Sequence, residues 1–174
     1  MTLETERLIL RPWREDDARW LYEYAKDPLV GPAAGWPPHT DPEDSLNIIR
    51  SVLSAPDTFA VTVKGDGRAV GSVGLKTPAL PVPTGELELG YWIGVPFWGR
   101  GYITEAAGGL LRYCFEEKGA ERLWCGHYEG NVRSRRVIEK CGFRLMVKRR
   151  SRVPLLGETR TEYYYALAKE EWRG

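Results

Sequence analysis

The 174-residue sequence lacks the features that mark several classes of protein. No segment approaches the ~20 apolar residues that span a bilayer, and the N-terminal "MTLETERLIL" has acidic residues where a secretory signal would have basic ones. With 25 Lys and Arg against 24 Asp and Glu, the chain also lacks the basic excess of a dedicated nucleic-acid binder. We therefore expect no membrane and no nucleic-acid partner. A solvated strand end accounts for the one basic run, Lys148 to Arg152.

Cysteine is scarce as well. Cys114, Cys125 and Cys141 are odd in number and widely spaced, and the sequence has neither a CxxC nor an HxxxH spacing that would offer a metal site. The three cysteines suit reduced thiols in a cytosolic protein. We therefore expect a cytoplasmic location and no bound metal.

What the chain does contain suits a packed globule. Apolar residues make up 43% of it and charged residues 28%, with 7 Trp. At this length we expect one domain, residues 1–174, that buries roughly two thirds of its unfolded surface.

Hydrophobic periodicity predicts about seven strands and four helices. The predicted strands are 7–13, 58–64, 69–76, 85–95, 122–127, 143–150 and 159–167, and the predicted helices are 14–27, 42–55, 102–118 and 131–141. Residues 28–42 are rich in Gly and Pro and are predicted to be a loop. This order describes a mixed α/β (α+β) domain with helices against a predominantly antiparallel sheet. The glycines of the strand at 85–95 suggest a bulge, or a group that approaches its backbone closely.

The stretch "VPFWGRGYITEA", Val95 to Ala106, puts two glycines just before a helix. Backbone N–H groups at such a place can bind phosphate, and glycine lets the anion approach. The stretch is not a Walker loop, because Gly101 is followed by Tyr102 and Ile103 rather than by Lys and Ser or Thr. It also lacks the third glycine of a dinucleotide fingerprint. By itself it indicates only a possible anion site.

A second stretch, "EGNVRSRRVIEKCGFR", places Asn131 at a helix start and Ser134 on the same face. Taken alone, Asn131 is a helix cap and Ser134 an exposed serine of the first turn.

Together, "ELGYWIGVPFWGRGYITEA" and, about 30 residues on, "NVRSRRVIEKCGF" resemble the GNAT acetyltransferase superfamily, in particular its RimJ/RimL-like branch, which acetylates protein N-termini. The resemblance runs from "TERLILRPW" almost to the C-terminus. It implies the GNAT acyl-CoA N-acyltransferase fold. Trp98 and Ile103 depart from the general Arg/Gln-x-x-Gly-x-Gly/Ala pattern, and the Trp-Gly-x-Gly-Tyr variant is familiar in that branch.

The resemblance implies an acetyl-coenzyme A site. The pyrophosphate would be held by backbone N–H groups of Gly99, Arg100, Gly101, Tyr102, Ile103 and Thr104. The backbone around Trp92 and Ile93 would take the pantetheine arm, and Asn131 matches the cofactor-contacting asparagine of the family. Whether Arg100 touches phosphate through its side chain stays open.

The chemistry that follows is attack of a neutral amine on the thioester. A backbone donor near Ile93 would stabilise the oxyanion. Glu88, through a water, is the expected base, with His127 as the second candidate, and Ser134 matches the position of the acid that protonates the leaving thiolate. Structural alternatives are that Glu88 pairs with a cation across the sheet and that His127 is only a polar strand-end residue.

The loop "GWPPHT", Gly35 to Thr40, would lie over the acceptor channel, with Trp36 and His39 as acceptor contacts; alternatively, Trp36 only packs the loop onto the core. The expected function is direct transfer of acetyl, in a ternary complex, to a protein or peptide N-terminal α-amine. The alternatives are a small amine such as an aminoglycoside, polyamine or amino acid, and a non-catalytic acyl-CoA-binding module. The resemblance allows a monomer or a homodimer.

Overall fold

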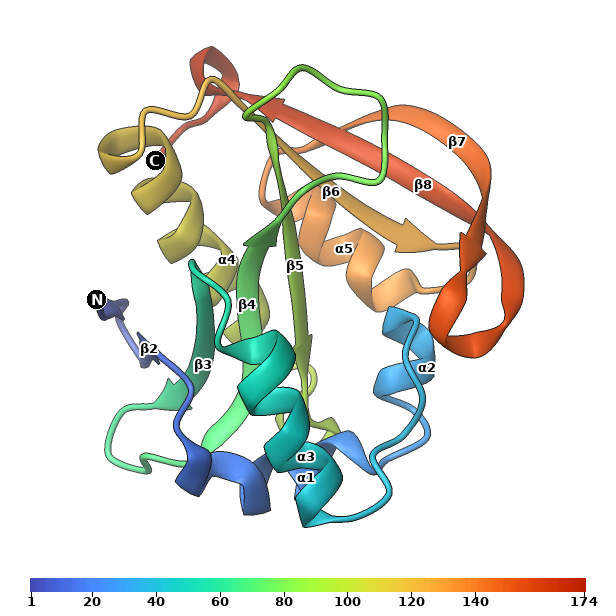
Figure 1. Cartoon of the computed structure of the whole chain (residues 1–174). Coiled ribbons are helices and arrows are strands. Elements are labelled where there is room, and N and C mark those ends of the chain that lie inside the picture. The colour runs from blue at the N-terminus through green and yellow to red at the C-terminus, as the bar shows by residue number, and fades with distance from the viewer.

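The computed structural model describes all residues, 1–174, and contains one mixed sheet of eight strands with five α-helices (Figure 1). The strands lie in the order β1-β2-β3-β4-β5-β6-β8-β7. They are β1 Leu3–Glu4, β2 Leu8–Arg11, β3 Thr58–Val63, β4 Ala69–Lys76, β5 Leu87–Ile93, β6 Arg122–Tyr128, β7 Arg144–Val153 and β8 Glu158–Ala168. The helices are α1 Ala18–Ala25, α2 Gly31–Ala34, α3 Pro42–Ile48, α4 Tyr102–Arg112 and α5 Val132–Lys140.

The predicted α/β class and sheet type are confirmed, while the strand and helix counts are each one too low. The additional strand is β1, a two-residue edge strand that pairs Leu3 with Leu10. The additional helix is α2, which lies within the segment predicted to be an irregular loop. Pro32 stands in its first turn and Gly35 ends it at φ +96°. Pro32 and Gly35 therefore begin and end a single helical turn, instead of marking an irregular loop.

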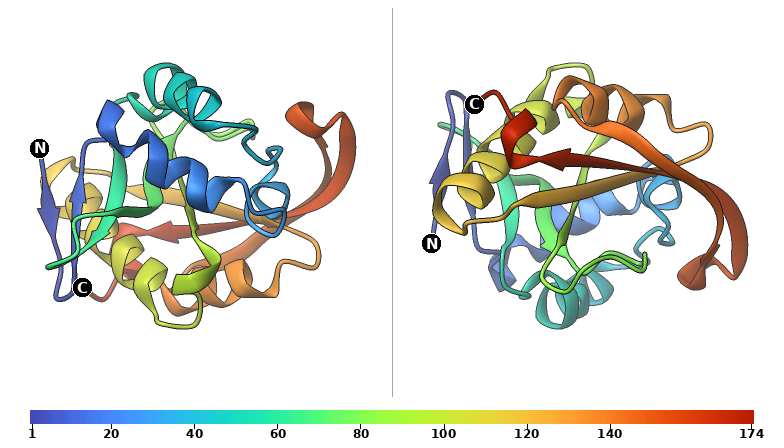
Figure 2. Two further views of the ribbon diagram at one scale, coloured as in Figure 1. Left: turned by 90° about the horizontal axis from the view of Figure 1, so that it is seen from below. Right: turned by 90° about the horizontal axis from the view of Figure 1, so that it is seen from above.

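Helices cover both faces of the sheet (Figure 2). Helix α4 packs on the strands through Ile103, Ala107 and Leu110, and all three are buried. Helices α1 and α3 cover the opposite face, where a smaller apolar cluster forms around Leu21. The two faces of β5 consequently point into different surroundings.

Strands β5 and β6 form the one parallel pair of the sheet, and it is short. Only three residue pairs join them: Leu87 with Leu123, Glu88 with Trp124, and Leu89 with Cys125. Beyond these pairs the two strands run apart, as Figure 1 shows. A gap therefore opens in the sheet between the remaining parts of β5 and β6.

The bulge predicted in the strand at 85–95 is not present. Strand β5 pairs with β4 in unbroken register from Glu88 opposite Lys76 to Ile93 opposite Gly71. The register shifts of the sheet lie elsewhere, at Val61/Thr62 and at Leu145/Val147. The glycines instead accompany the separation of β5 from β6.

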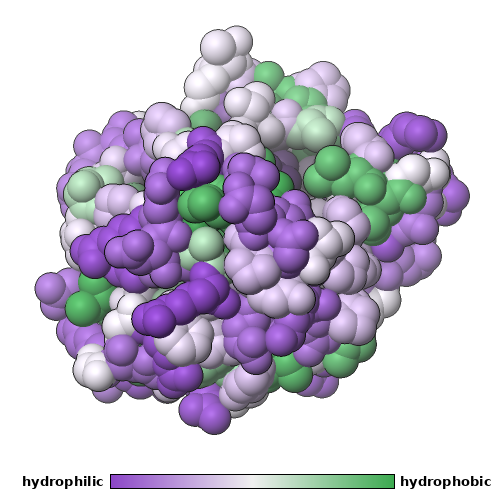
Figure 3. Space-filling model, turned by 60° about the horizontal axis from the view of Figure 1, so that its bottom comes forward, coloured by the Kyte–Doolittle hydropathy of each residue, from purple (hydrophilic) through white to green (hydrophobic).

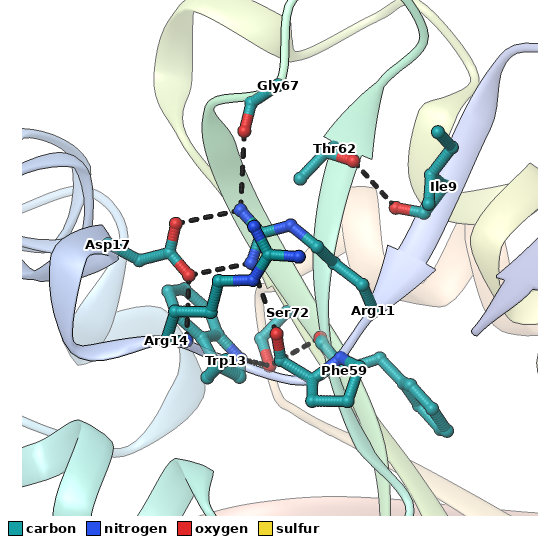
Figure 4. A network of polar contacts seen from close by, with 10 residues as sticks. Ile9, Arg11, Trp13, Arg14, Asp17, Phe59, Thr62, Gly67 and Ser72 are labelled. Atoms are coloured by element: carbon teal, nitrogen blue, oxygen red, sulfur yellow. Dashed lines mark hydrogen bonds and ion pairs between the residues drawn. The ribbon is translucent and has the colours of Figure 1, made fainter. Parts of the chain in front are cut away.

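A buried ion pair fixes the corner between β2 and α1 (Figure 4). The Arg11 guanidinium donates to both carboxylate oxygens of Asp17 at 2.7 and 2.8 Å, and Asp17 also accepts from the Arg14 N–H at 2.9 Å. Asp17 therefore stands just before α1, but its side chain bonds to Arg11 and Arg14, which precede it in the chain, and does not cap that helix. Beside it, the Trp13 indole donates to Ser72 on β4 at 3.3 Å.

The surface seen in Figure 3 is mostly hydrophilic, with small, separate hydrophobic areas. Single exposed side chains such as Leu155, at 70% exposure, are ordinary on folded proteins. Among the helices of the chain, none has the length and apolar character needed to cross a bilayer.

Candidate active site

The Gly99-Arg100-Gly101 loop leads directly into α4. Gly99 and Gly101 have φ of +74° and +76°, a region that residues with a Cβ rarely adopt. The backbone N–H groups from Gly99 to Thr104 donate to no acceptor within the protein. Six successive free donors, at the positive end of an 11-residue helix, form a concave site suited to an anion.

This loop offers an anion its backbone groups rather than its side chains. Ile103 is buried in the core, so only its N–H is available. The Arg100 guanidinium lies 5.7 Å from the centroid of the Phe97 ring and makes no ion pair, and the Tyr102 ring lies beneath the Arg7 guanidinium at 4.7 Å. The loop therefore offers backbone groups, as the sequence predicts.

The free edge of β5 lies beside this loop. Gly94 donates to Val70 on β4 at 2.9 Å, so the alternation of an antiparallel pair directs the backbone groups of Tyr91 and Ile93 to the other edge, toward β6. The Trp98 indole satisfies the Ile93 carbonyl at 3.0 Å. This leaves the Ile93 N–H as a free donor at the gap, although the predicted bulge is absent.

Ser134 lies on α5, across the gap from β5. Its Oγ is 2.8 Å from the Tyr91 hydroxyl, which also donates to the Ser134 carbonyl at 3.1 Å. Burial raises the pKa of Tyr91 well above its usual value, so the phenol keeps its proton. Tyr91 is thus the partner that orients Ser134.

Asn131 caps α5, as the residue taken alone predicts, and also contacts α2. Its Oδ1 accepts from the Ser134 N–H at 3.2 Å and caps α5. Its Nδ2 donates to the Ala33 carbonyl at 3.4 Å, which ties α5 to α2. The described contacts of Asn131 are therefore structural.

Glu88 is buried on the opposite face of β5. Its Oε1 is 3.2 Å from the Lys76 ammonium on β4, so the predicted cross-sheet pairing with a cation exists. Its Oε2 is buried and has no hydrogen-bond partner. Burial raises the pKa of the Glu88 carboxyl, against the opposing effect of Lys76. A buried carboxylate oxygen without a donor is costly, and such groups are common where a protein handles protons.

His127 lies on the other face of β6 and both of its ring nitrogens are engaged. Nδ1 is 2.9 Å from the Tyr128 carbonyl and Nε2 is 3.1 Å from the Tyr165 hydroxyl. The ring also stacks on Tyr163 at 5.1 Å. This arrangement gives His127 a structural role and separates it from Glu88, which faces the opposite side of the sheet.

Trp36 and His39 lie together on the Glu88 face. The Trp36 ring meets Trp92 edge-on at 5.7 Å and His39 at 5.3 Å. His39 Nδ1 is 2.8 Å from the Ser45 hydroxyl on α3, and burial lowers the pKa of its imidazole. Trp36 therefore packs the α2 loop onto Trp92 and also forms part of this side of the gap.

Two glycines leave the floor of this side without side chains. Gly90 on β5 and Gly126 on β6 each lie two residues beyond Glu88 and Trp124, the last cross-strand pair on this face, and a Cβ on Gly90 would meet nothing within 4 Å. A Cβ on Gly126 would lie 3.4 Å from Glu162 Oε1. Glu162, from β8, has no ion-pair partner and accepts only from the Tyr164 hydroxyl, at 2.8 Å. Nothing in the sequence around Glu162 points to this position, because only the pairing of β6 with β8 brings it here.

No group of three or more His, Cys, Asp or Glu side chains is placed to hold a metal ion. Burial raises the pKa of Cys141 to about 11 and that of Cys114 to about 12, and neither cysteine has a histidine partner. No side chain here is arranged as a covalent nucleophile with its base.

A splayed parallel pair beside a helix N-terminus with free amides agrees with the acetyltransferase resemblance of the sequence. The "Acetyltransferase (GNAT) domain" family matches residues 7–144, and the chain belongs to this family of N-acetyltransferases. A solved GNAT-family acetyltransferase from Bacillus anthracis superposes with a TM-score of 0.87 at 28% identity, covering 98% of this chain and 100% of that one.

Three curated relatives resemble the chain in sequence. The uncharacterized N-acetyltransferase p20 of Bacillus licheniformis is 28% identical over 99% of both chains. YdaF of Bacillus subtilis, whose name assigns it provisionally to ribosomal N-acetylation, is 37% identical over 63% of this chain and 58% of its own. The FsC-acetyl coenzyme A-N(2)-transacetylase of Aspergillus fumigatus is 28% identical over 98% of this chain and 77% of its own.

Proposed function

We propose that the protein transfers acetyl from acetyl-CoA directly to a primary amine, and that the amine is the N-terminal α-amine of a protein or peptide. The six unbonded N–H groups from Gly99 to Thr104 carry this proposal, because successive free donors at a helix N-terminus fit a pyrophosphate. From there the free edge of β5 around Trp92 and Ile93 would receive the pantetheine arm as a strand receives its neighbour. Asn131 stands at the end of α5 that borders the same gap.

The free groups at the gap divide the chemistry between its two sides. On the Glu88 face, the unpartnered Oε2 takes a proton from the incoming ammonium through a water. At the thioester, the Ile93 N–H donates to the carbonyl oxygen as it becomes an oxyanion. On the α5 side, the Ser134 hydroxyl, oriented by Tyr91, gives a proton to the departing thiolate and regains one from water.

The choice of an α-amine follows from its acidity. An α-amino group has a pKa of about 8 and a lysine side chain one of about 10.4, so the α-amine reaches its neutral form with much less help. A single carboxylate with a raised pKa is enough base for such an acceptor. YdaF supports the RimJ/RimL-like assignment, since its name refers to ribosomal N-acetylation. The three unpaired cysteines support a cytoplasmic location.

A small amine is the second candidate acceptor. The Aspergillus relative acetylates an N(2) position, according to its name. In this chain Glu162 adds a second carboxylate beside the Gly90 and Gly126 floor, and an acidic pocket favours small polycations over a peptide.

The function can be tested by calorimetric titration with acetyl-CoA followed by thiol release in the presence of acceptors. The panel should contain peptides with a free α-amine, the same peptides with a blocked α-amine and a free lysine, and small di- and polyamines. We expect thiol release with free α-amines. Release with small amines alone would move the function to the second candidate, binding without release on any acceptor would indicate a non-catalytic module, and no binding would overturn the proposal.

The role of Glu88 has its own test, Glu88→Gln. Removing a general base costs on the order of 100-fold in rate, and the loss should appear in kcat with little change in acetyl-CoA binding. Because only ionised Glu88 accepts a proton, wild-type activity should rise with pH through a pKa above the ordinary carboxyl value, and this limb should vanish in the variant. Unchanged turnover from pH 6 to 9 would remove Glu88 from the mechanism.

A further inference from the structure

The residues just before β2 contact the Gly99–Gly101 loop and the start of α4, although the two segments lie almost a hundred residues apart in sequence. The Arg7 guanidinium donates through Nε to Glu105 Oε2 at 2.6 Å and through NH1 to the Arg100 carbonyl at 2.9 Å. Its face covers the Tyr102 ring at 4.7 Å. One side chain thus contacts the loop and two residues of the first turn of α4, Tyr102 and Glu105.

Glu105 is the other half of this contact, and its carboxylate is nearly saturated. Besides the Arg7 guanidinium it accepts from the Arg7 N–H at 2.7 Å and the Thr5 hydroxyl at 2.6 Å. Burial alone would raise the pKa of Glu105, but the hydrogen bonds from Thr5 and Arg7 lower it on balance. The carboxylate therefore stays ionised and anchors Arg7.

The geometry points to Arg7 as a positioning residue for the cofactor loop. Glu105 holds the Arg7 guanidinium, and the hydrogen bond from Arg7 to the Arg100 carbonyl fixes the orientation of the neighbouring N–H groups. A peptide unit is planar, so holding the Arg100 carbonyl also holds the Gly101 N–H of the same unit on its opposite side. The loop needs such a restraint because both flanking glycines are conformationally free. This inference rests on the proposed acetyl-CoA site.

An effect through charge and an effect through positioning predict opposite changes in the CoA affinity of Glu105→Gln, so this variant distinguishes the two roles. If Arg7 and Glu105 acted on the phosphates only through their charges, Glu105→Gln would remove a negative charge near an anion and tighten binding. If they position the loop, the same variant loses the ion pair with Arg7 Nε and weakens binding. Arg7→Lys keeps the charge but cannot donate to Glu105 and to the Arg100 carbonyl in one planar fork.

The experiment measures calorimetric Kd for CoA and steady-state kinetics in wild type, Arg7→Gln, Arg7→Lys and Glu105→Gln. We expect Kd and the KM for acetyl-CoA to rise about tenfold in Arg7→Gln, and severalfold in the other two variants, with the KM for the acceptor unchanged. S-acetylpantetheine carries the same thioester without the pyrophosphate, so its kcat/KM should be the same in all four proteins. Arg50→Gln is the matched control, because Arg50 also bonds a glutamate through two nitrogens but lies far from the loop in the fold.

The outcomes are distinct. Tighter CoA binding in Glu105→Gln, or an equal loss with acetyl-CoA and S-acetylpantetheine, would overturn the positioning role. If Arg7→Gln fails to fold, Arg7→Lys and Glu105→Gln still decide between charge and position. If wild type itself binds no CoA, the proposed function fails, whereas wild-type binding with unaltered variants refutes only the role of Arg7.

Discussion

At the scale of single residues, the site is defined by groups that the fold leaves free. Glu88 keeps one buried carboxylate oxygen without a donor, and the loop from Gly99 to Thr104 keeps its amides free. By contrast, the polar side-chain atoms of His127 and Asn131 are hydrogen-bonded within the protein. The sequence could propose all of these residues, but only the placement of their partners separates them.

Ser134→Ala should lower kcat about 10- to 100-fold, the low end for a lost general acid, because a thiolate is a good leaving group. Binding of CoA should change little, and Tyr91→Phe should give a smaller loss because Ser134 remains but loses its orienting hydrogen bond. Steady-state kinetics measure both. Ser51→Ala is the control, since the Ser51 hydroxyl is exposed and bonds only the Asn47 carbonyl. A kcat equal to wild type in Ser134→Ala would exclude the acid role.

Glu88→Gln should also change stability in a pH-dependent way. The pKa of Glu88 is raised in the folded state, so its contribution to stability is present below the unfolded pKa and is lost as pH rises through the folded value. The variant lacks this loss, so its free energy of unfolding relative to wild type should increase from pH 4 to pH 8. Urea unfolding at several pH values measures it, and a pH-independent difference would contradict the raised pKa.

At the scale of elements, the strongly periodic segments form as their sequence pattern predicts, and the exceptions have local causes. Strand β1 is too short to show alternation and exists because β2 offers it an edge. Helix α2 has one turn, and its place is set by tertiary contacts: Arg160 on β8 donates to the Pro32 carbonyl at 2.5 Å and Asn131 on α5 donates to that of Ala33. Such partners cannot be inferred from the residues of the segment itself.

The corner between β2 and α1 depends on the Arg11–Asp17 pair, both of whose side chains are at most 12% exposed. Asp17→Asn should lower the free energy of unfolding by about 3–5 kcal/mol, because it leaves a buried guanidinium without its charge partner. Urea denaturation measures this, with Asp16→Asn as the neighbouring exposed control. The activity of the folded fraction should persist, and a cost like that of the control would mean that the pair contributes nothing.

At the scale of the whole molecule, the sheet is two half-sheets joined by three residue pairs between β5 and β6. Residues 1–93 supply one half and the C-terminal segment supplies the other, with α4 and α5 on one face of the gap and α1 to α3 on the other (Figure 2). A cofactor seated in the gap would contact both halves. The proposed transfer therefore takes place where the two halves of the chain meet.

Binding of CoA should add about 2.7 kcal/mol to the free energy of unfolding at 100 times Kd, and the melting temperature should rise accordingly. It should also slow amide exchange at Tyr91 and Ile93, whose backbone groups face the gap, and in the Gly99–Thr104 loop. Hydrogen exchange with and without CoA measures this. Slower exchange confined to the loop would show that the cofactor does not pair with β5.

The sequence by itself determined the strands and helices other than β1 and α2, the helix cap at Asn131 and the Gly-Arg-Gly loop, because these depend on periodicity and on local backbone preferences. Only the tertiary structure decided which side of the sheet each candidate faces, that Glu88 has a free oxygen, that Arg7 contacts the Arg100 carbonyl and that Glu162 lies beside Gly126. The reason is physical: strand pairing brings together residues far apart in the chain, and whether a polar group stays free depends on every partner that the fold places around it.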